Sequence, residues 1–352
     1  MKEKIVTFAH TEYHLLLFIN LLINEEEKGI VNDHILYVRG QNGFRIPKNL
    51  NFSYLSVDVR LSAEKFKEDS PLNHDSKILL DTLLSIQPNK FIFFQEQDLL
   101  SHILADRWKQ KYNTAIFLYQ DGLKPYNILK YNSLGLMKLH YKYNLWMKRN
   151  GFSIHSWFSP LWSHRYAYMK NIDEVYLTFP EAYVNWNKKN VKKIEFLNYE
   201  KLKIQLEKVF NWNDNLLPQK EGIIFYLSQP MRDDGTIEDA FIQKLVESFP
   251  KHEIYLKLHP NIQQHKIDIY NKNANLTIIT ARIPAELFIM QLSKSLVISM
   301  NSTSMFINNI NCKFYYIHEV FKNDIKRLSR YDIKVHPAPH IHLAKKIEDI
   351  TF

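Results

Sequence analysis

The stretch KIVTFAH, residues 4–10, followed at once by TEYHLLLFINLL, residues 11–22, decides the fold class. The first part is rich in β-branched and aromatic residues and predicts a strand. Thr11 is a residue type that caps the amino termini of helices, and the apolar run behind it predicts a buried helix. A strand followed directly by a helix is the unit from which mostly parallel α/β sheets are built.

The same alternation recurs along the rest of the chain in two series. The first series predicts strands at 34–40, 51–59, 90–96, 114–122, 174–179 and 193–198, and helices at 98–113 and 199–212. The second predicts strands at 223–230, 253–260, 276–280, 296–300 and 313–319, and helices at 236–249, 284–295 and from about 302. The polar segment 213–222, which contains a proline and a glycine, predicts a linker. We therefore predict two doubly wound, Rossmann-like α/β domains that face a cleft, at residues 1–212 and 223–352.

Composition agrees with a packed protein of two domains. The 352 residues suit two domains of roughly 150 residues, and an apolar content of 45% excludes a disordered chain. The single cysteine, Cys312, indicates a reducing compartment. Polar residues interrupt the first apolar run, no small-residue cleavage site follows it, and no run reaches the roughly 18 residues of a membrane span. We therefore expect a cytoplasmic protein.

Positive charge is concentrated in one aromatic segment. The formal net charge is +9, which favours anionic partners, and residues 122–172 contain no Asp or Glu. Within about 124–170 the sequence suggests an acceptor-side or membrane-side surface formed by Lys138, Lys142, Trp146, Arg149 and Trp157. This segment either holds a glycan by aromatic stacking, rests at the periphery of an anionic inner membrane, or is a helical insertion that buries its aromatic rings and exposes its lysines.

Polar residues follow several predicted strands, at the edge where α/β sheets bind ligands. Asp121 ends one strand and Gly122 follows it, which suits either a general base at the rim or an ordinary Asp–Gly turn. His259 ends another strand directly before Pro260. It is either a core or capping histidine or, because the pKa of histidine is near neutrality, a group that stabilises or protonates a leaving phosphate. Lys257 has the same parity on that strand and adds positive charge.

Further candidate site residues lie at the start of turns or helices in the predicted second domain. Ser228 and Gln229 follow its first strand, and Glu286 lies in the first turn of a predicted helix, where a carboxylate is also favoured by the helix dipole alone. Ser302, Thr303 and Ser304 offer hydroxyl and N–H groups that suit a phosphate, although an ordinary helix cap explains them too. No glycine-rich phosphate loop, paired cysteines or HExxH pattern is present, so no metal is expected.

The order of these motifs along the chain resembles that of the bacterial sialyltransferases of the two-domain GT-B architecture. The motifs are, in order, Asp-Gly, Ser-Gln-Pro, His-Pro, Pro-Ala-Glu and a Ser/Thr cluster. That group includes the lipooligosaccharide sialyltransferases (family 52) and the capsule polysialyltransferases. The motif with two acidic residues before glycine corresponds to Gln120-Asp121-Gly122, so its first acidic position is absent here. The Asp-Asp-Gly at 233–235 is a competing match, which makes Asp234 the runner-up for the base.

The resemblance implies an inverting, metal-independent transferase that moves sialic acid or a related nonulosonic acid from a CMP-activated donor to a cell-surface glycan, such as lipooligosaccharide or capsule. Asp121 would deprotonate the acceptor, His259 would act on the leaving phosphate, and Glu286 would bind the cytidine ribose. Ser228, Gln229, Lys257, Pro260 and residues 302–304 would line the donor site. The first domain would hold the acceptor and the second the donor, with no further cofactor.

Two alternatives stay open at this point. One is a GT-B transferase for another nucleotide donor, such as a UDP-sugar or CDP-glycerol. The other is a basic nucleic-acid-binding protein, against which stands the absence of any helix-turn-helix, zinc or RNP pattern. We therefore expect CMP-sialic acid and a glycan as partners, and no nucleic acid.

Overall fold

The computed structural model describes residues 2–38, 47, 50, 57–61, 72–96, 98–126, 128–129, 133–152, 166–229, 235–259, 270, 275–321, 331–332 and 338–352. Residue contacts divide the chain inside helix α5 (Tyr199–Val209). Unit 1 comprises the described residues up to Leu202 together with Asp332, and unit 2 comprises the others. By this division the predicted linker, 213–222, belongs wholly to unit 2.

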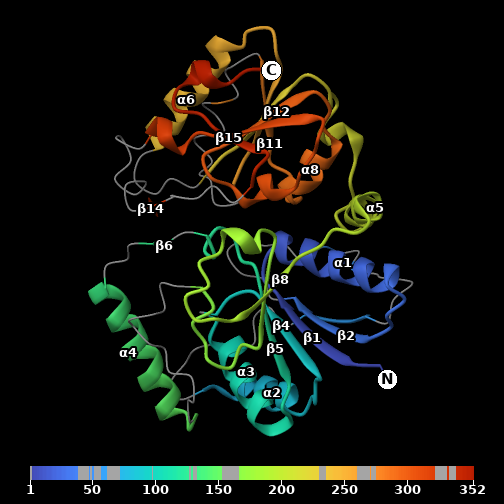
Figure 1. Ribbon diagram of the computed structural model, residues 1–352, viewed down its shortest axis with the longest axis vertical. Coiled ribbons are helices and arrows are strands. Elements are labelled where there is room, and N and C mark those ends of the chain that lie inside the picture. The colour runs from blue at the N-terminus through green and yellow to red at the C-terminus, as the bar shows by residue number, and fades with distance from the viewer. Residues whose placement is uncertain are drawn as a thin grey trace. The chain divides into compact units, whose positions relative to one another are not determined.

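Unit 1 is built on a seven-stranded parallel sheet with the strand order β3-β2-β1-β4-β5-β7-β8 (Figure 1). Its strands are β1 (Lys4–Ala9), β2 (Asp33–Val38), β3 (Val57–Leu61), β4 (Lys90–Phe93), β5 (Ala115–Tyr119), β7 (Glu174–Leu177) and β8 (Asn190–Lys193). The order reverses between β1 and β4, so the sheet is doubly wound and its ligand-binding edge is the one at the carboxyl ends of the strands.

Helices cover both faces of this sheet. The described helices of unit 1 are α1 (Glu12–Glu27), α2 (His74–Leu84), α3 (Leu99–Tyr112) and α4 (Ser133–Arg149). Phe8, Phe91 and Phe93 of the sheet form one core with α2 and α3. Ile5 and Ile92, of opposite parity, line a pocket together with Leu17 of α1. Figure 1 shows α1 on one side of the sheet and α2 and α3 on the other. Thr11 caps α1 as expected, because its hydroxyl accepts the N–H of His14 at 3.2 Å.

Unit 2 repeats the same topology with a six-stranded parallel sheet in the order β11-β10-β9-β12-β13-β15. Its strands are β9 (Ile224–Leu227), β10 (Ile254–Lys257), β11 (Leu276–Ile279), β12 (Ser295–Ser299), β13 (Cys312–Tyr316) and β15 (Ile341–Leu343), and its α-helices are α6 (Gly235–Ser248) and α8 (Ala285–Gln291). The 3₁₀ turns among the described residues are η1 (Pro180–Ala182), η2 (Asp214–Leu216), η3 (Thr303–Phe306), η4 (His318–Phe321) and η6 (Ile347–Asp349). Strands β6 (Ile128–Leu129) and β14 (Tyr331–Asp332) lie outside both large sheets. The predicted doubly wound α/β class is confirmed in both units.

Three predicted elements differ from the structure. The strand expected at 193–198 is β8, which ends at Lys193 because the next turns are held by α1: Asn20 and Asn24 both donate to the carbonyl of Glu195 at 2.7 Å. The helix expected at 284–295 ends at Gln291, because Leu292 is already extended, with a φ of -79° and a ψ of 150°. The helix expected from 302 is only the 3₁₀ turn η3.

In the part of the chain that the structure describes, every helix is too short or too polar to span a bilayer.

Candidate functional site

Asp121 lies just beyond the carboxyl end of β5, and the first turn of α1 meets it there. The Oδ1 atom of Asp121 is 3.1 Å from Nε2 of His14, a histidine that is fully buried, while the Asp121 side chain is 33% exposed. Gly122 has a φ of 61°, a conformation that glycine adopts without strain and that turns the chain directly after the carboxylate. The predicted combination of a rim carboxylate and a turning glycine is present.

The surroundings of Asp121 favour its ionised form. Burial raises the pKa of Asp121, but the hydrogen bond from His14 and the electrostatic influence of His14, Lys124 and His10 outweigh burial, so this pKa lies below its ordinary value. Asp121 is therefore ionised at neutral pH and open to a proton donor, while its lowered pKa makes it a weak base at that pH.

Gln120, the residue at the first acidic position of the motif, has a structural role. Its side chain is fully buried, and its Oε1 accepts the hydroxyl of Tyr126 at 2.5 Å and the N–H of Thr178 at 2.9 Å. Its Nε2 donates to the hydroxyl of Tyr13 at 3.1 Å. The amide therefore joins the ends of β5 and β7 to α1 and offers no group to a substrate, so Asp121 is the acidic residue of this motif.

Glu96, which the sequence analysis did not single out, is a second carboxylate beyond the sheet edge. It follows β4, is 1% exposed, and accepts the N–H groups of Ala167 at 2.8 Å and Met169 at 3.1 Å. Burial raises the pKa of Glu96 even though Lys124 and these hydrogen bonds act in the other direction. Glu96 fixes the segment that returns from the basic aromatic region, where Ala167 has a φ of 59°. Its role became visible only with its partners, some seventy positions later in the chain.

In unit 2, three neighbouring strands end in a connected group of polar residues. The hydroxyl of Ser228, after β9, accepts the N–H of His259, after β10, at 3.4 Å. The hydroxyl of Ser299, the last residue of β12, donates to the carbonyl of Leu227 at 3.3 Å and accepts the N–H of Ser302 at 3.1 Å. The structure thus brings together Ser228, His259 and the 302–304 turn, as the sequence predicted.

Burial and neighbouring positive charges determine the electrostatics of His259. Burial and the positive charges of Lys257 and Arg282 hold the pKa of His259 below its ordinary value. Without an anion beside it, the ring of His259 is therefore mainly neutral at pH 7. Lys257 is 8% exposed and donates to the carbonyl of Ala281 at 2.7 Å, above the ring of Phe288, so it acts on His259 through its charge.

Two glutamates of unit 2, Glu238 and Glu286, are buried. Glu238 of α6 accepts the N–H of Gln229 at 3.0 Å and the hydroxyl of Tyr226 at 3.1 Å, and it is fully buried. Gln229 is therefore tied to α6 through its backbone, a role for Glu238 that the sequence analysis missed. Glu286 lies in the first turn of α8, as expected, and is 3% exposed.

The turn at 302–304 is half-buried, and several of its polar groups already make hydrogen bonds within the protein. The hydroxyl of Ser302 accepts the N–H of Ser304 at 3.3 Å, and Tyr316 donates to the carbonyl of Ser302 at 2.8 Å. Because η3 is a 3₁₀ turn of four residues, it has no α-helix dipole that would attract a phosphate. What the turn offers to a ligand is the hydroxyl groups of Ser302, Thr303 and Ser304.

The basic aromatic segment contains α4, and its described residues divide between core and surface. Trp146 is 7% exposed and belongs to the core of unit 1, stacked against Phe152 with ring centroids 5.9 Å apart. The expectation that Trp146 contacts an acceptor or a membrane is therefore wrong, because an inserted helix needs an apolar side to pack on its domain. Lys138, Lys142 and Arg149 are exposed.

Three candidates, Asp234, Pro260 and Trp157, lie outside the described residues. Within the described residues, no group of three or more His, Cys, Asp or Glu side chains is arranged to hold a metal ion.

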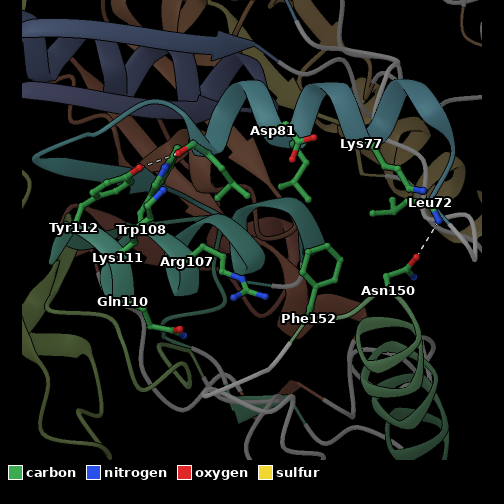
Figure 2. A pocket seen from close by; sticks show the side chains of 12 residues that line it. Leu72, Lys77, Asp81, Arg107, Trp108, Gln110, Lys111, Tyr112, Asn150 and Phe152 are labelled. Atoms are coloured by element: carbon green, nitrogen blue, oxygen red, sulfur yellow. Dashed lines mark hydrogen bonds between the residues drawn. The ribbon is translucent and has the colours of Figure 1, made fainter.

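A cavity of about 530 Å³ lies between α2 and α3 in unit 1 (Figure 2). Figure 2 shows Asp81 and Lys77 of α2 across from Arg107 of α3, with the ring of Phe152 beside Arg107. The part of α3 that lines it is the last turns, which lead into the amino end of β5, whereas Asp121 follows the carboxyl end. The cavity is therefore separate from the Asp121 site.

Comparison with known families gives one extended match. Residues 59–315, more than half of the chain, match the family model of the alpha-2,8-polysialyltransferases. The sequence matches no curated protein.

Solved structures with a similar fold include bacterial sialyltransferases. The GT-B domain of a sialyltransferase from Photobacterium damselae is 12% identical with a TM-score of 0.57, over 97% of this chain and 100% of that one. A 2,6-sialyltransferase from Photobacterium sp. JT-ISH-224, in a ternary complex with the donor product CMP and the acceptor substrate lactose, is 11% identical with a TM-score of 0.50, over 97% of this chain and 78% of that one. At such identities these structures establish the fold, which is that of the GT-B glycosyltransferases.

Proposed function

The chain belongs to the alpha-2,8-polysialyltransferase family, and we propose that it transfers sialic acid from a CMP-activated donor to a hydroxyl group of a glycan, with Asp121 as the general base. Family and fold make it a glycosyltransferase that acts in sialyl transfer. The observation that carries the proposal is the position of Asp121: a partly exposed carboxylate at the ligand-binding edge of unit 1, held there by a hydrogen bond to the buried His14.

The proposed reaction is a single displacement. The acceptor hydroxyl loses its proton to Asp121 as its oxygen forms a bond to the anomeric carbon of the donor. The bond from that carbon to the phosphate oxygen breaks, CMP leaves with the electron pair, and the configuration at the carbon inverts. The proton on Asp121 then passes to water. This role for a positioned base accounts for about 10²- to 10⁴-fold of rate.

We assign the donor to the polar group at the strand ends of unit 2. A CMP-activated sugar leaves a single phosphate, which the ring N–H of His259 and the hydroxyl groups of residues 302–304 are suited to bind without a metal ion. The charge of Lys257 adds to the attraction for that phosphate. The fold relative from Photobacterium sp. JT-ISH-224 was captured with CMP and lactose, which supports this choice of donor and of a glycan acceptor. Lipooligosaccharide or capsule at a cell surface is the acceptor class that we propose.

Incubation with CMP-sialic acid and a panel of galactoside and sialoside acceptors, with CMP release as the readout, tests the proposal. We expect Asp121→Asn to lower kcat by about 10²- to 10⁴-fold. The matched control is Asp33→Asn, at the start of β2, which we expect to leave kcat unchanged. Full activity of Asp121→Asn would overturn the assignment of the base.

The donor is tested separately from the acceptor. A nucleotide that binds only the native protein raises its melting temperature. We expect CMP to do so and UMP to do so much less, and a reversed order would favour a UDP-sugar donor. Equal stabilisation by CDP-glycerol and CMP-sialic acid, with release of CMP only from the former, would favour the glycerol-phosphate alternative.

A further inference from the structure

His14 adopts one tautomer because of its two hydrogen bonds. Its Nδ1 accepts the backbone N–H of His10 at 3.1 Å, and a backbone N–H can only donate, so Nδ1 carries no proton. The proton of the neutral ring is therefore on Nε2, 3.1 Å from Oδ1 of Asp121, and is donated to that carboxylate. The local fold thus orients the histidine so that its only N–H group points at the proposed base.

The ring of His14 is held in this position from three sides. It is fully buried, and it stacks on Phe94, after β4, with centroids 4.0 Å apart and planes 6° from parallel. The hydroxyl of Thr11 binds the backbone N–H of His14 and fixes the first turn of α1. These contacts come from α1 and from the ends of β1 and β4, so the core of unit 1 determines where Nε2 lies.

We propose that His14 is a positioning residue, which orients Asp121 through the Nε2–H donor and directs its second oxygen to the acceptor hydroxyl. This inference rests on the proposed role of Asp121 as the base. Hydrogen bonding engages Oδ1, whereas Oδ2 makes no hydrogen bond to any described residue. A donor that acts on one oxygen restricts rotation of the carboxylate and leaves the other oxygen to accept a proton.

The other charged or titratable groups that face Asp121 are few. His10 lies at the end of β1, with its Nε2 3.9 Å from Oδ2 of Asp98, and Lys124 lies in the turn after β5; both lower the pKa of Asp121. Tyr166 lies close enough to interact electrostatically, but it donates its hydroxyl to the carbonyl of Tyr119 at 2.5 Å, and burial raises its pKa, so it stays neutral. Among these groups, His14 alone makes a hydrogen bond to the carboxylate.

Two substitutions separate orientation of Asp121 from folding of α1. In His14→Asn, the Oδ1 atom replaces Nδ1 and keeps the bond from the His10 amide, but the donor to Asp121 is lost. In His14→Gln, the terminal amide reaches the position of Nε2 and keeps that donor. For His14→Asn we expect kcat to fall by about 10- to 100-fold with KM within about twofold, and the acidic limb of the pH profile to move to higher pH. His14→Gln should regain most of kcat and the original limb.

A second readout does not depend on catalysis. In protein labelled with ¹³C at Asp carboxyl groups, the Asp121 signal is identified by its absence from Asp121→Asn, and its titration is followed in the wild type, His14→Asn and His14→Gln. A higher Asp121 pKa in His14→Asn alone supports the proposal. An unchanged Asp121 pKa, or a His14→Gln variant that folds but is as inactive as His14→Asn, would overturn it. Absence of sialyl transfer by the wild type would refute the proposed function. The titration would still show whether His14 controls the pKa of Asp121.

Discussion

Two adjacent residues at the end of β5, Gln120 and Asp121, differ in burial and in role. Gln120 is fully buried with its amide committed to three neighbours, whereas Asp121 is one-third exposed and ionised. Strand residues alternate in direction, so neighbours in sequence point to opposite sides as the chain leaves the sheet. In the sequence motif the two positions are equivalent. In the structure, Gln120 holds neighbouring elements together, whereas Asp121 is the proposed reactive group.

Replacement of Gln120 by leucine should therefore act on stability. The buried N–H of Thr178 and the hydroxyl of Tyr126 would lose their acceptor, which costs about 2–4 kcal/mol of unfolding free energy. The control is Gln87→Leu, an exposed site between α2 and β4, where we expect a change of less than about 0.5 kcal/mol. Urea unfolding of both variants measures the difference; equal midpoints would contradict the role given to Gln120.

His259 predicts a pH dependence of donor binding with a definite sign. The pKa of the free ring lies below its ordinary value because of burial, Lys257 and Arg282, and a phosphate bound beside the ring would raise it. Binding would then take up a proton, so affinity should increase as the pH falls through the range between the two pKa values. For cytidine 5′-methyl phosphate, whose diester does not titrate there, we expect about tenfold tighter binding at pH 5.5 than at pH 8.

Calorimetry on the wild type, His259→Asn and His74→Asn measures this effect. His74 is exposed on α2 of unit 1 and serves as the control, which should behave as the wild type. His259→Asn should bind equally at both pH values. A pH dependence that survives in His259→Asn would show that another group contacts the phosphate.

At the scale of elements, the turn after β5 depends on Gly122. An added Cβ would meet no atom within 4 Å there, so only the positive φ of 61° opposes a side chain. The same holds for Gly151 after α4, at a φ of 75°. Both Gly→Ala substitutions should cost about 1–2 kcal/mol of stability. Only Gly122→Ala displaces Asp121, so we expect it alone to lower kcat, by about tenfold or more.

Thermal unfolding and CMP release in both alanine variants give the comparison. Similar losses of melting temperature with activity lost only at Gly122 would support the turn as the element that aims Asp121. Loss of activity in both variants to the same extent would assign the effect to stability alone.

The elements that were predicted correctly have local signals, whereas contacts between residues far apart in the sequence do not. Thr11 with its apolar run predicted α1, and the amphipathic pattern of 98–113 predicted α3. Thr11 caps α1 as expected, and the structure shows that Asp98 caps α3. The partner of His14 lies 107 positions away in sequence, and the partners of Glu96 lie more than 70 away. No pattern of nearby residues reports such pairs, because the sheet order that brings them together is set by packing of the whole domain.

At the scale of the whole molecule, the family match runs from residue 59 to 315 and so takes in both units. Positive charge is unevenly spread over this chain. The net charge is +9, and residues 122–172 have no acidic residue to offset their lysines and arginines. A sialylated acceptor carries carboxylates, so a basic surface near its site would raise its local concentration and would be weakened by salt.

Charge reversal on α4 tests whether this surface attracts the acceptor. Lys138→Glu with Lys142→Glu lowers the net charge from +9 to +5, and so does the control pair Lys244→Glu with Lys251→Glu, on exposed sites of unit 2. With an oligosialic acceptor at low salt, we expect the α4 pair to raise KM by roughly tenfold and the control pair by much less. The difference should shrink as salt rises above about 0.5 M, because screening then removes the attraction. Equal effects of the two pairs would mean that the acceptor senses only the total charge, and a KM for the α4 pair equal to that of the wild type would remove α4 from the acceptor side.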